Sequence, residues 1–477
     1  MYDTVLQDIL SGVRQPSRYL GHEVNHVRKD PQSVRLMVAL AFPDLYEIGT
    51  SHLGLQILYS LLNARPEIAA ERVFAPDLDM EAQLRRHQQP LVSLESKRPL
   101  GHFDIVGFSL LSELNYTNVL HMLELAQIPF RAEQREGRHP LVIAGGPCMF
   151  NPEPVADFFD AIVVGDGEEA ILAMADAWLA WQTEGGGDRQ SLLQHWQGVS
   201  GVYIPAFYET TFDGKGLPQT TARDRFRESV RRAILSDLAE MPPPDDPIVP
   251  YGRPVHDRLR VEVARGCTRG CRFCQAGMIY RPVRERSVDN LLEYTTRALG
   301  NTGFDELSLL SLSTGDYGCI EPLMTGLSER FSRQRNAISL PSLRVDTLSD
   351  EMIDLIKSVR KTGFTLAPEA GSQRLRDVIN KNIRQAEIFN TVRRVFEHGW
   401  RLIKLYFMIG LPTESDTDRA AIAELARELR HIRAPHLKSP PALNISVATF
   451  IPKAHTPFQW MAQMAPEEAT EVLTRLR

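Results

Sequence analysis

The sequence predicts an α/β protein of two parts, each built from parallel strands that alternate with helices. Three observations support this fold class. Apolar, strand-like runs recur on both sides of a stiff, proline-rich connector, Met241-Pro-Pro-Pro-Asp-Asp-Pro-Ile-Val-Pro250. Helical patterns separate these runs, and several runs end in glycine turns. Such alternation is typical of parallel sheets, which bind ligands at the carboxyl ends of their strands.

The composition is that of an ordinary globular protein. The chain has 477 residues, of which 43% are hydrophobic and 24% charged, and a length of this order predicts two or three domains. No apolar run is long enough to indicate a membrane span, and the N-terminus lacks the apolar core of a signal peptide. The net charge of −6 gives no overall nucleic-acid footprint. Five cysteines, three of them clustered, argue against a disulfide framework, so we expect a cytoplasmic protein.

The predicted N-terminal domain, residues 1–182, has strand-like runs that end in small residues. Its predicted strands lie at 33–42, 104–111, 140–147 and 160–165, and its predicted helices at 52–62, 115–127 and 168–181. Phe74-Ala-Pro76 is predicted to be a short connector. Glycine turns follow the last two strands, at Gly145 and Gly146 and at Gly165 and Gly167. This pattern predicts a doubly wound, Rossmann-like sheet with ligand-binding turns at its carboxyl edge.

Residues 183–254 are predicted to be a bridging segment with one strand at 201–209, and residues 255–477 a second domain. Six strand units in the second domain fit a partial (β/α)6 TIM barrel, whose sites lie at the strand carboxyl ends. The six strands are expected at 259–264, 306–312, 339–345, 362–368, 402–410 and 442–452. Helices are expected between them, for example at 349–361 and 373–380.

Three cysteines form a cluster directly after the first of these strands. Cys267, Cys271 and Cys274 are spaced C-x3-C-x2-C, whereas Cys148 and Cys319 stand alone. Structural zinc sites usually close with four protein ligands. Three thiolates instead suit a 4Fe–4S cluster with one iron open to a small molecule. A zinc knuckle and a chance cluster are the alternatives.

The cysteine motif and its flanks resemble the signature of the radical S-adenosylmethionine (radical SAM) family. The preceding strand, the turn glycine Gly270 and the aromatic Phe273 all match that pattern. The resemblance implies that the three cysteines hold a 4Fe–4S cluster whose open iron binds S-adenosylmethionine. It further implies reductive cleavage to a 5′-deoxyadenosyl radical, with the electron supplied by a donor such as flavodoxin or ferredoxin.

The same resemblance implies further cofactor-binding residues at the ends of later strands. Ser313-Thr-Gly315-Asp316 takes the place of the family's Gly-Gly-Glu motif, which holds the methionyl amino group, with an aspartate for the glutamate. Ala367-Pro-Glu369-Ala-Gly371-Ser372 looks like a segment of methylthiotransferases that faces S-adenosylmethionine. Gly410 lies where the family's backbone approaches adenine.

For other polar residues after the strands, two structural roles are possible. Arg344 and Asp346 are expected either at the barrel mouth or, for Arg344, in a surface ion pair. Lys453, His455 and Trp460 are expected either to line the substrate mouth or to belong to a loop that caps the barrel.

The N-terminal domain resembles the cobalamin-binding domain that precedes many radical SAM cores. In that family, turns like those at Gly145, Gly146, Gly165 and Gly167 lie near the nucleotide tail of the corrinoid. Histidine-ligating cobalamin domains carry D-x-H-x-x-G, a spacing that Asp44 and His52 do not have. The resemblance therefore implies either cobalamin without a protein histidine on cobalt, or a degenerate domain that keeps only the fold. For His52, the start of a helix is the alternative role.

The order of motifs along the whole chain most resembles an uncharacterised family of radical SAM proteins with a cobalamin-binding domain. It implies a radical SAM enzyme that transfers a methyl group to an unidentified substrate. One alternative is a cobalamin-free radical enzyme that modifies RNA or a ribosomal component, with the N-terminal domain binding substrate. A non-catalytic Fe–S or zinc scaffold is the other. Because relatives often continue past the sixth strand, the end at Arg477 is expected to mark a short or truncated form.

Overall fold

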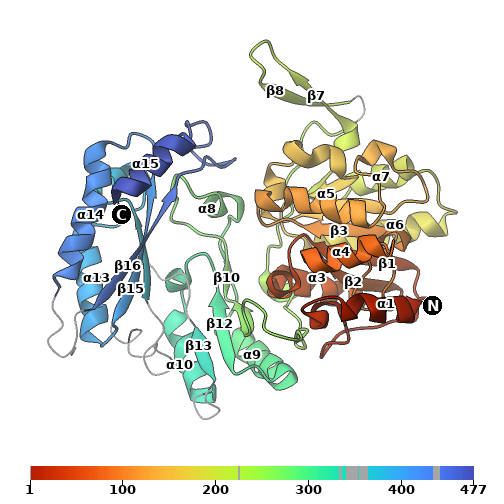
Figure 1. Cartoon of the computed structure of the whole chain (residues 1–477), viewed down its shortest axis with the longest axis horizontal. Coiled ribbons are helices and arrows are strands. Elements are labelled where there is room, and N and C mark those ends of the chain that lie inside the picture. Colours follow the sequence, from red (N-terminus) through yellow and green to blue (C-terminus); the bar gives the residue numbers. More distant parts are fainter. Residues whose placement is uncertain are drawn as a thin grey trace. The chain divides into compact units, whose positions relative to one another are not determined.

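The computed structural model describes residues 2–223, 226–331, 336–339, 353, 364–432 and 441–476. The chain folds into two compact units, Met1–Asp257 with Gly300–Thr302, and Arg258–Leu299 with Gly303–Arg477 (Figure 1). Both units contain parallel sheets with helices between successive strands, which confirms the predicted α/β fold class. Among the described residues, no helix is both long and apolar enough to cross a lipid bilayer.

The N-terminal unit is organised around a sheet of strand order β2-β1-β3-β4-β5-β6. The first five strands are parallel, and β6 is antiparallel to β5. The order 2-1-3-4-5 is a doubly wound arrangement whose direction of winding reverses between β1 and β3. The strands are β1 (Leu36–Phe42), β2 (Ile68–Phe74), β3 (Ile105–Ser109), β4 (Leu141–Gly145), β5 (Ala161–Val163) and β6 (Val202–Tyr203).

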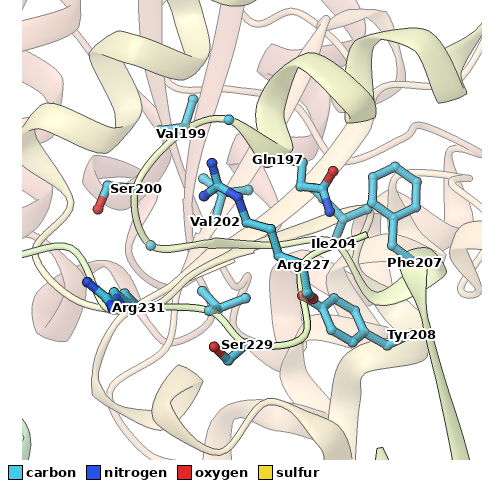
Figure 2. A pocket seen from close by; sticks show the side chains of 13 residues that line it. Gln197, Val199, Ser200, Val202, Ile204, Phe207, Tyr208, Arg227, Ser229 and Arg231 are labelled. Carbon is cyan, nitrogen blue, oxygen red and sulfur yellow. The ribbon is translucent and has the colours of Figure 1, made fainter. Parts of the chain in front are cut away.

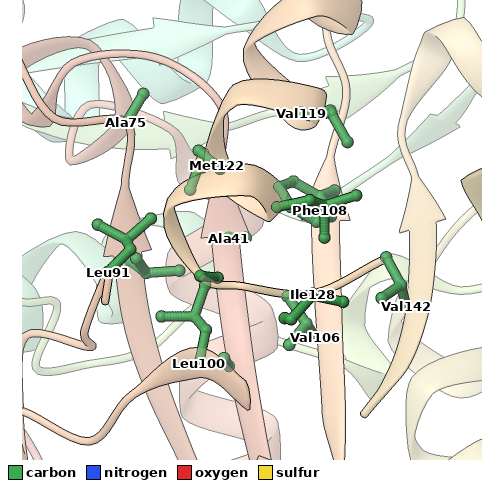
Figure 3. Packing of buried hydrophobic residues seen from close by; sticks show 14 of the residues in the cluster. Ala41, Ala75, Leu91, Leu100, Val106, Phe108, Val119, Met122, Ile128 and Val142 are labelled. Carbon is green, nitrogen blue, oxygen red and sulfur yellow. The ribbon is translucent and has the colours of Figure 1, made fainter. Parts of the chain in front are cut away.

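Helices cover both faces of this sheet. On one face, Val106 and Phe108 of β3 belong to the same buried cluster as Val119 and Met122 of α5, as Figure 3 shows. Burial of each such side chain stabilises the unit by about 1.5–3 kcal/mol. The helices of this face are α1 (Tyr2–Ser11), α4 (Leu78–Arg86) and α5 (Tyr116–Leu125); those of the other are α3 (Leu53–Asn63), α6 (Glu168–Thr183) and α7 (Arg189–Gln197).

The prediction of a simple connector around Phe74 is wrong, because Phe74 ends the buried strand β2. Two charged residues, Glu71 and Arg72, lie within β2 and are both buried. Arg72 pairs with Glu95 at 2.7 Å and with Glu23 at 2.9 Å. Charged residues are usually exposed, and they are buried only when they are paired. Because these pairs are not visible in the local sequence, Glu71 and Arg72 made β2 look like an exposed segment.

The single strand predicted at 201–209 is also wrong in detail. Strand β6 ends at Tyr203, a 3-10 turn covers Pro205–Phe207, and a second strand, β7 (Tyr208–Phe212), follows. Proline lacks the N–H that a continuous strand would use, and its fixed φ suits the start of a helical turn. Strand β7 forms an antiparallel hairpin with β8 (Pro218–Ala222), visible at the edge of the unit in Figure 1.

The second unit contains two three-stranded parallel sheets, of order β13-β12-β9 and β14-β15-β16. Their strands are β9 (Leu259–Glu262), β12 (Glu306–Leu310), β13 (Ala337–Ser339), β14 (Phe364–Glu369), β15 (Leu402–Ile409) and β16 (Ala442–Thr449). Helices between the strands include α9 (Val288–Thr302), α10 (Ile320–Phe331), α12 (Gln373–Val378), α13 (Gln385–Glu397) and α14 (Asp416–Arg430). Arg344, Asp346 and most of the helix predicted at 349–361 lie outside the described residues.

Candidate active site

The cysteine cluster lies in a loop that follows β9 and the short strand β10 (Ala264–Arg265). Gly266 starts this loop at φ 103°, a conformation that favours glycine. A Cβ there would lie 2.6 Å from the carbonyl oxygen of Tyr280 and 2.7 Å from that of Pro282. Gly266 thus lets the returning chain pack directly against the start of the cysteine loop.

The end of α12 fixes the far side of this loop. The Arg272 backbone N–H donates to the Ile379 carbonyl at 3.0 Å, and Arg272 Nη1 donates to that of Val378 at 2.6 Å. In the other direction, Asn380 Nδ2 donates to the Gly270 carbonyl at 2.9 Å. Three hydrogen bonds therefore connect residues more than a hundred positions apart, and hold the loop against the segment that follows β14.

The three cysteine thiols are close enough to influence one another electrostatically. Burial raises the pKa of the Cys274 thiol, and negative charge on Cys271 and Cys267 raises it further. The Gly277 N–H donates to Cys274 Sγ at 3.4 Å and opposes this rise. Among the described residues, no group of three or more His, Cys, Asp and Glu side chains is arranged so that it could hold a metal ion. Three thiols on one loop are the donor set that a cluster with three protein ligands needs.

A pair of charged residues joins the cysteine loop to the turn after β12. Asp316 ends the 3-10 turn Thr314–Asp316. Arg269 Nε donates to Asp316 Oδ2 at 2.8 Å, and Arg269 Nη2 donates to Asp316 Oδ1. The Ser313 hydroxyl, nearby in sequence, is buried and has no hydrogen-bond partner in the part of the chain that the structure describes. Sequence reasoning identified Gly315 and Asp316 but missed Arg269, although its position inside the cysteine motif was a signal.

Glu369, at the end of β14, has backbone strain and a charged partner. Its φ is 69°, which is unusual for a residue other than glycine. Its Oε1 accepts a hydrogen bond from Lys381 Nζ at 3.1 Å. The same ammonium lies 6.0 Å from the centre of the Phe273 ring, at the outer limit for a cation–π contact. Lys381 therefore connects the aromatic residue of the cysteine motif to a predicted cofactor-binding carboxylate.

Gly371 and Ser372 pack against the start of α14. A Cβ at Gly371 would lie 2.3 Å from the backbone nitrogen of Ile422. Ser372 caps α12 by accepting from the Leu375 N–H at 3.2 Å, and its hydroxyl donates to Asp418 Oδ1 at 2.5 Å. The structure thus gives both predicted cofactor-binding residues a definite packing role.

The turn after β15 is held by a buried carboxylate. Gly410 has φ 75°, and its N–H donates to Glu414 Oε2 at 2.7 Å. Burial raises the pKa of Glu414, whereas the Gly410 N–H and Arg419, whose Nε lies 2.9 Å away, lower it. These contacts fix the Gly410 backbone in place.

A hydrogen bond joins the loop after β16 to the cysteine loop. Gln275 Nε2 donates to the carbonyl of Ala454 at 3.3 Å. Lys453 and His455 flank that residue, and His455 has φ 65°. Trp460 is 83% exposed.

In the N-terminal unit, the four predicted glycines fall into two classes. A Cβ at Gly146 would lie 2.5 Å from the Leu110 carbonyl oxygen, and one at Gly165 would lie 2.2 Å from that of Ala233. Both have positive φ, so packing of the unit itself requires glycine there. At Gly145 and Gly167, by contrast, a Cβ would meet its nearest atoms at 3.9 and 3.6 Å. Of the four, only these two positions would accept a Cβ at ordinary contact distances.

His52 occupies the start of α3. Its Nδ1 accepts a hydrogen bond from the Leu55 N–H at 3.1 Å, which is a helix-capping contact. Asp44 accepts from the Leu45 N–H at 2.8 Å and from Asn115 Nδ2 at 3.3 Å. The structure therefore places His52 in the helix-start role.

Comparisons with known proteins agree with this architecture. A family model described as "Radical SAM proteins, N-terminal" matches residues 54–205, and one described as "Radical SAM superfamily" matches residues 261–426. An uncharacterized protein of Methanocaldococcus jannaschii is 28% identical over 88% of this chain and 79% of its own length. A tRNA-2-methylthio-N(6)-dimethylallyladenosine synthase of Acetivibrio thermocellus is 25% identical in a matched region. That region covers 36% of this chain and 37% of the synthase.

Two solved structures share the fold over most of the chain. One is the radical S-adenosylmethionine methyltransferase TsrM of Kitasatospora setae with cobalamin and a 4Fe–4S cluster bound. The match to TsrM has a TM-score of 0.58 at 13% identity, and it covers 89% of this chain and 74% of TsrM. The other is the cobalamin-dependent radical enzyme OxsB, with a TM-score of 0.55 at 14% identity, covering 92% of this chain and 55% of OxsB. The family matches in both units, together with the cysteine loop after the first strand of the second, identify the chain as a member of the radical SAM superfamily.

Proposed function

We propose that this radical SAM enzyme binds a 4Fe–4S cluster through Cys267, Cys271 and Cys274 and cleaves S-adenosylmethionine reductively. The observation that carries the proposal is the cysteine loop itself. It places three thiols after a parallel strand and is fixed by hydrogen bonds from Arg272 and Asn380. When bound, the cluster would supply the electron that breaks the sulfonium bond of S-adenosylmethionine.

The protein's own side chains would position S-adenosylmethionine. The Asp316 carboxylate is the proposed partner of the methionyl ammonium, because a charge-assisted hydrogen bond contributes about 1.5–3 kcal/mol. Glu369, Gly371 and Ser372 are proposed to form the neighbouring wall, and the fixed backbone at Gly410 to receive the adenine. Ser372 would act from a rigid helix start, since its hydroxyl is already bonded to Asp418.

We further propose that the N-terminal unit binds cobalamin and that the reaction is methyl transfer. The likeness of fold to TsrM and OxsB supports this, and packing of the unit does not by itself require glycine at Gly145 and Gly167. Asp44 and His52 lack the D-x-H-x-x-G spacing, so we propose that the corrinoid has no protein histidine on cobalt.

A second candidate function has a separate observation behind it. The partial relatives include synthases that methylthiolate tRNA and methylthiotransferases of ribosomal protein uS12. This favours, as the alternative, a cobalamin-free radical enzyme that modifies RNA or a ribosomal component.

The decisive experiment is anaerobic reconstitution of the full chain with iron and sulfide, followed by addition of S-adenosylmethionine and a low-potential reductant. We expect 5′-deoxyadenosine and methionine to form in equal amounts, and Cys271→Ala to form neither. A reconstituted cluster that releases no 5′-deoxyadenosine would contradict the proposed cleavage.

Cobalamin is tested by loading hydroxocobalamin and passing the protein through gel filtration. The wild type should retain the corrinoid, and Gly145→Val should lose it; the melting temperature of the variant checks that the unit still folds, since a Cβ at this position meets Val163 at an ordinary contact distance of 3.9 Å. His52→Ala should leave the corrinoid spectrum unchanged. Wild-type protein that emerges without corrinoid, while still cleaving S-adenosylmethionine, would favour the RNA- or ribosome-modifying alternative.

A further inference from the structure

A separate pocket lies within the N-terminal unit, away from the residues assigned above. Its volume is about 320 Å³. Three segments line it: the turn from Gln197 to Val202 after α7, the turn and strand start from Ile204 to Tyr208, and the segment from Arg227 to Arg231 (Figure 2). Small-molecule pockets usually have volumes of about 300–1,000 Å³, so this one suits a small ligand.

One side of the pocket is positively charged. Arg227 and Arg231 both line it, and no aspartate or glutamate of the described part of the chain does. Neither guanidinium has an ion-pair partner among the described residues. Figure 2 shows the Arg227 side chain extending across the pocket toward the turn that carries Val199 and Val202. The Tyr208 hydroxyl donates to the Arg227 carbonyl at 2.8 Å and fixes the backbone from which this side chain extends.

A residue of the pocket lining carries an unsatisfied donor. Gln197 Nε2 is buried and has no hydrogen-bond partner among the described residues. A buried donor without a partner destabilises the folded protein, and a hydrogen bond to an acceptor atom would relieve that cost. Two arginines and an unsatisfied amide together favour a ligand with several acceptor oxygens and negative charge, for which phosphate is the best match to guanidinium geometry.

Other residues of the pocket lining are apolar and aromatic. Val202, Ile204 and Phe207 are buried, and the Phe207 ring stacks on Phe226 at a centroid distance of 3.9 Å. Tyr208 packs at 4.7 Å from Tyr203 and is partly exposed. A ligand that fills the pocket therefore needs a planar or apolar body beside its charged group.

From this combination we propose that the pocket binds a nucleoside monophosphate group, with the phosphate on Arg227, Arg231 and Gln197 and the base against the aromatic residues. Two sources share this chemistry, a free nucleotide and the 5′-phosphorylated end of an RNA strand. The proposal does not depend on the cluster or on cobalamin, since no residue assigned to either lines the pocket.

The test is calorimetric titration of the purified full chain, without added corrinoid, at low and moderate salt. The probes are AMP, adenosine and inorganic phosphate. We expect AMP to bind at least tenfold more tightly than either of the others, because only AMP engages both groups of residues. AMP that binds no better than adenosine, or no better than phosphate, would overturn the proposal.

Three variants locate the site. Arg227→Gln should weaken AMP binding about tenfold, while Arg86→Gln, an exposed arginine at the end of α4, should have no effect. Gln197→Met should also weaken AMP binding, but the melting temperature of the free protein should stay equal or rise, because the unsatisfied donor is gone. Unchanged AMP affinity in both Arg227→Gln and Gln197→Met would place the nucleotide elsewhere and reject the site.

A last probe separates the two sources. A 5′-phosphorylated six-nucleotide RNA should bind more tightly than AMP, with the same dependence on Arg227, if the pocket receives an RNA end. If AMP binds and this RNA does not, the source is a free nucleotide. Either outcome supports the pocket as a nucleoside phosphate site.

Discussion

Arg269 binds Asp316 with two parallel hydrogen bonds, one from Nε to Oδ2 at 2.8 Å and one from Nη2 to Oδ1. The side chains are 29% and 23% exposed, so this pair stabilises the fold by only about 1 kcal/mol or less. Its chief effect is on the availability of the carboxylate. A positively charged ligand that approaches Asp316 must compete with the arginine or share the carboxylate with it.

The first prediction concerns S-adenosylmethionine affinity. Asp316→Asn should weaken binding tenfold or more and leave the cluster intact, because it removes the charge that faces the methionyl ammonium. Arg269→Gln should instead tighten binding two- to fivefold, since it removes a competing cation. Calorimetry on the reconstituted protein measures both. An unchanged dissociation constant in Asp316→Asn would remove Asp316 from the site, and equal weakening by both variants would show that the pair binds the ligand as a unit.

The second prediction concerns cluster ligation. Cys267→Ala, Cys271→Ala and Cys274→Ala should each abolish the absorbance near about 400 nm that thiolate-bound Fe–S clusters give. Cys148→Ala and Cys319→Ala should retain it. Iron and sulfide analysis of each anaerobically reconstituted variant measures the cluster content per chain independently of the absorbance. Loss of the cluster in a Cys148 or Cys319 variant, with the three others tolerated, would refute the assignment.

The third prediction separates tight from open glycines. Gly371→Ala should destabilise the second unit by roughly 1–3 kcal/mol, because the new methyl group would overlap the Ile422 backbone. Gly300→Ala is the matched control, since a Cβ at this helical position would meet no described atom outside its own helix backbone within 4 Å. It should stabilise the protein by about 0.5–1 kcal/mol. Urea unfolding of both variants measures these changes. An unchanged free energy of unfolding in Gly371→Ala would mean that α14 moves aside easily.

The fourth prediction is a pH dependence. Burial alone would raise the pKa of Asp418, but hydrogen bonds from Arg374, Ser372 and Ser415 hold it well below its usual range. The folded state therefore binds the proton more weakly than the unfolded chain does. The stabilisation is complete above the unfolded pKa of about 3.9 and is lost as the pH falls below that value.

Asp418→Asn should accordingly cost about 1.5–3 kcal/mol at pH 7 and progressively less toward pH 3. Asp416→Asn, whose carboxylate is 89% exposed, serves as the control and should change little at any pH. Urea midpoints at several pH values give the comparison. If the stability lost in Asp418→Asn relative to the wild type stays constant from pH 7 to pH 3, the pKa of Asp418 is not lowered in the folded state.

Much of the fold could be predicted because most strands have a recognisable local sequence pattern. Strands β9, β12, β15 and β16 have apolar patterns that need no information from distant residues. Strand β2 could not be found this way, because Arg72 is neutralised by Glu23 and Glu95, which lie far away in the chain. Propensity describes a residue's average surroundings, and a buried ion pair departs from that average.

The candidate site shows the same division. The cysteine spacing is local, so the sequence alone was enough to propose its ligands. The contacts that hold the loop are not local, since Asn380 reaches Gly270 across 110 positions and Arg269 reaches Asp316 across 47. Gly146 and Gly165 are predicted cofactor contacts, and neighbouring backbone also requires glycine at both positions, so the glycine pattern does not separate the two causes. Distinguishing a glycine needed for packing from one needed for a ligand requires the three-dimensional structure.

The close approach of Ala233 to Gly165 also bears on how the N-terminal unit could be isolated. Ala233 N–H donates to the Val164 carbonyl at 2.8 Å, and β6 pairs with β5. A fragment cut at residue 182 would leave β5 as an unprotected edge strand and uncover the apolar face beneath Trp196 and Phe207. Such a fragment would be prone to self-association through that edge. Production of this half of the protein alone should therefore extend to residue 257, where the compact unit ends.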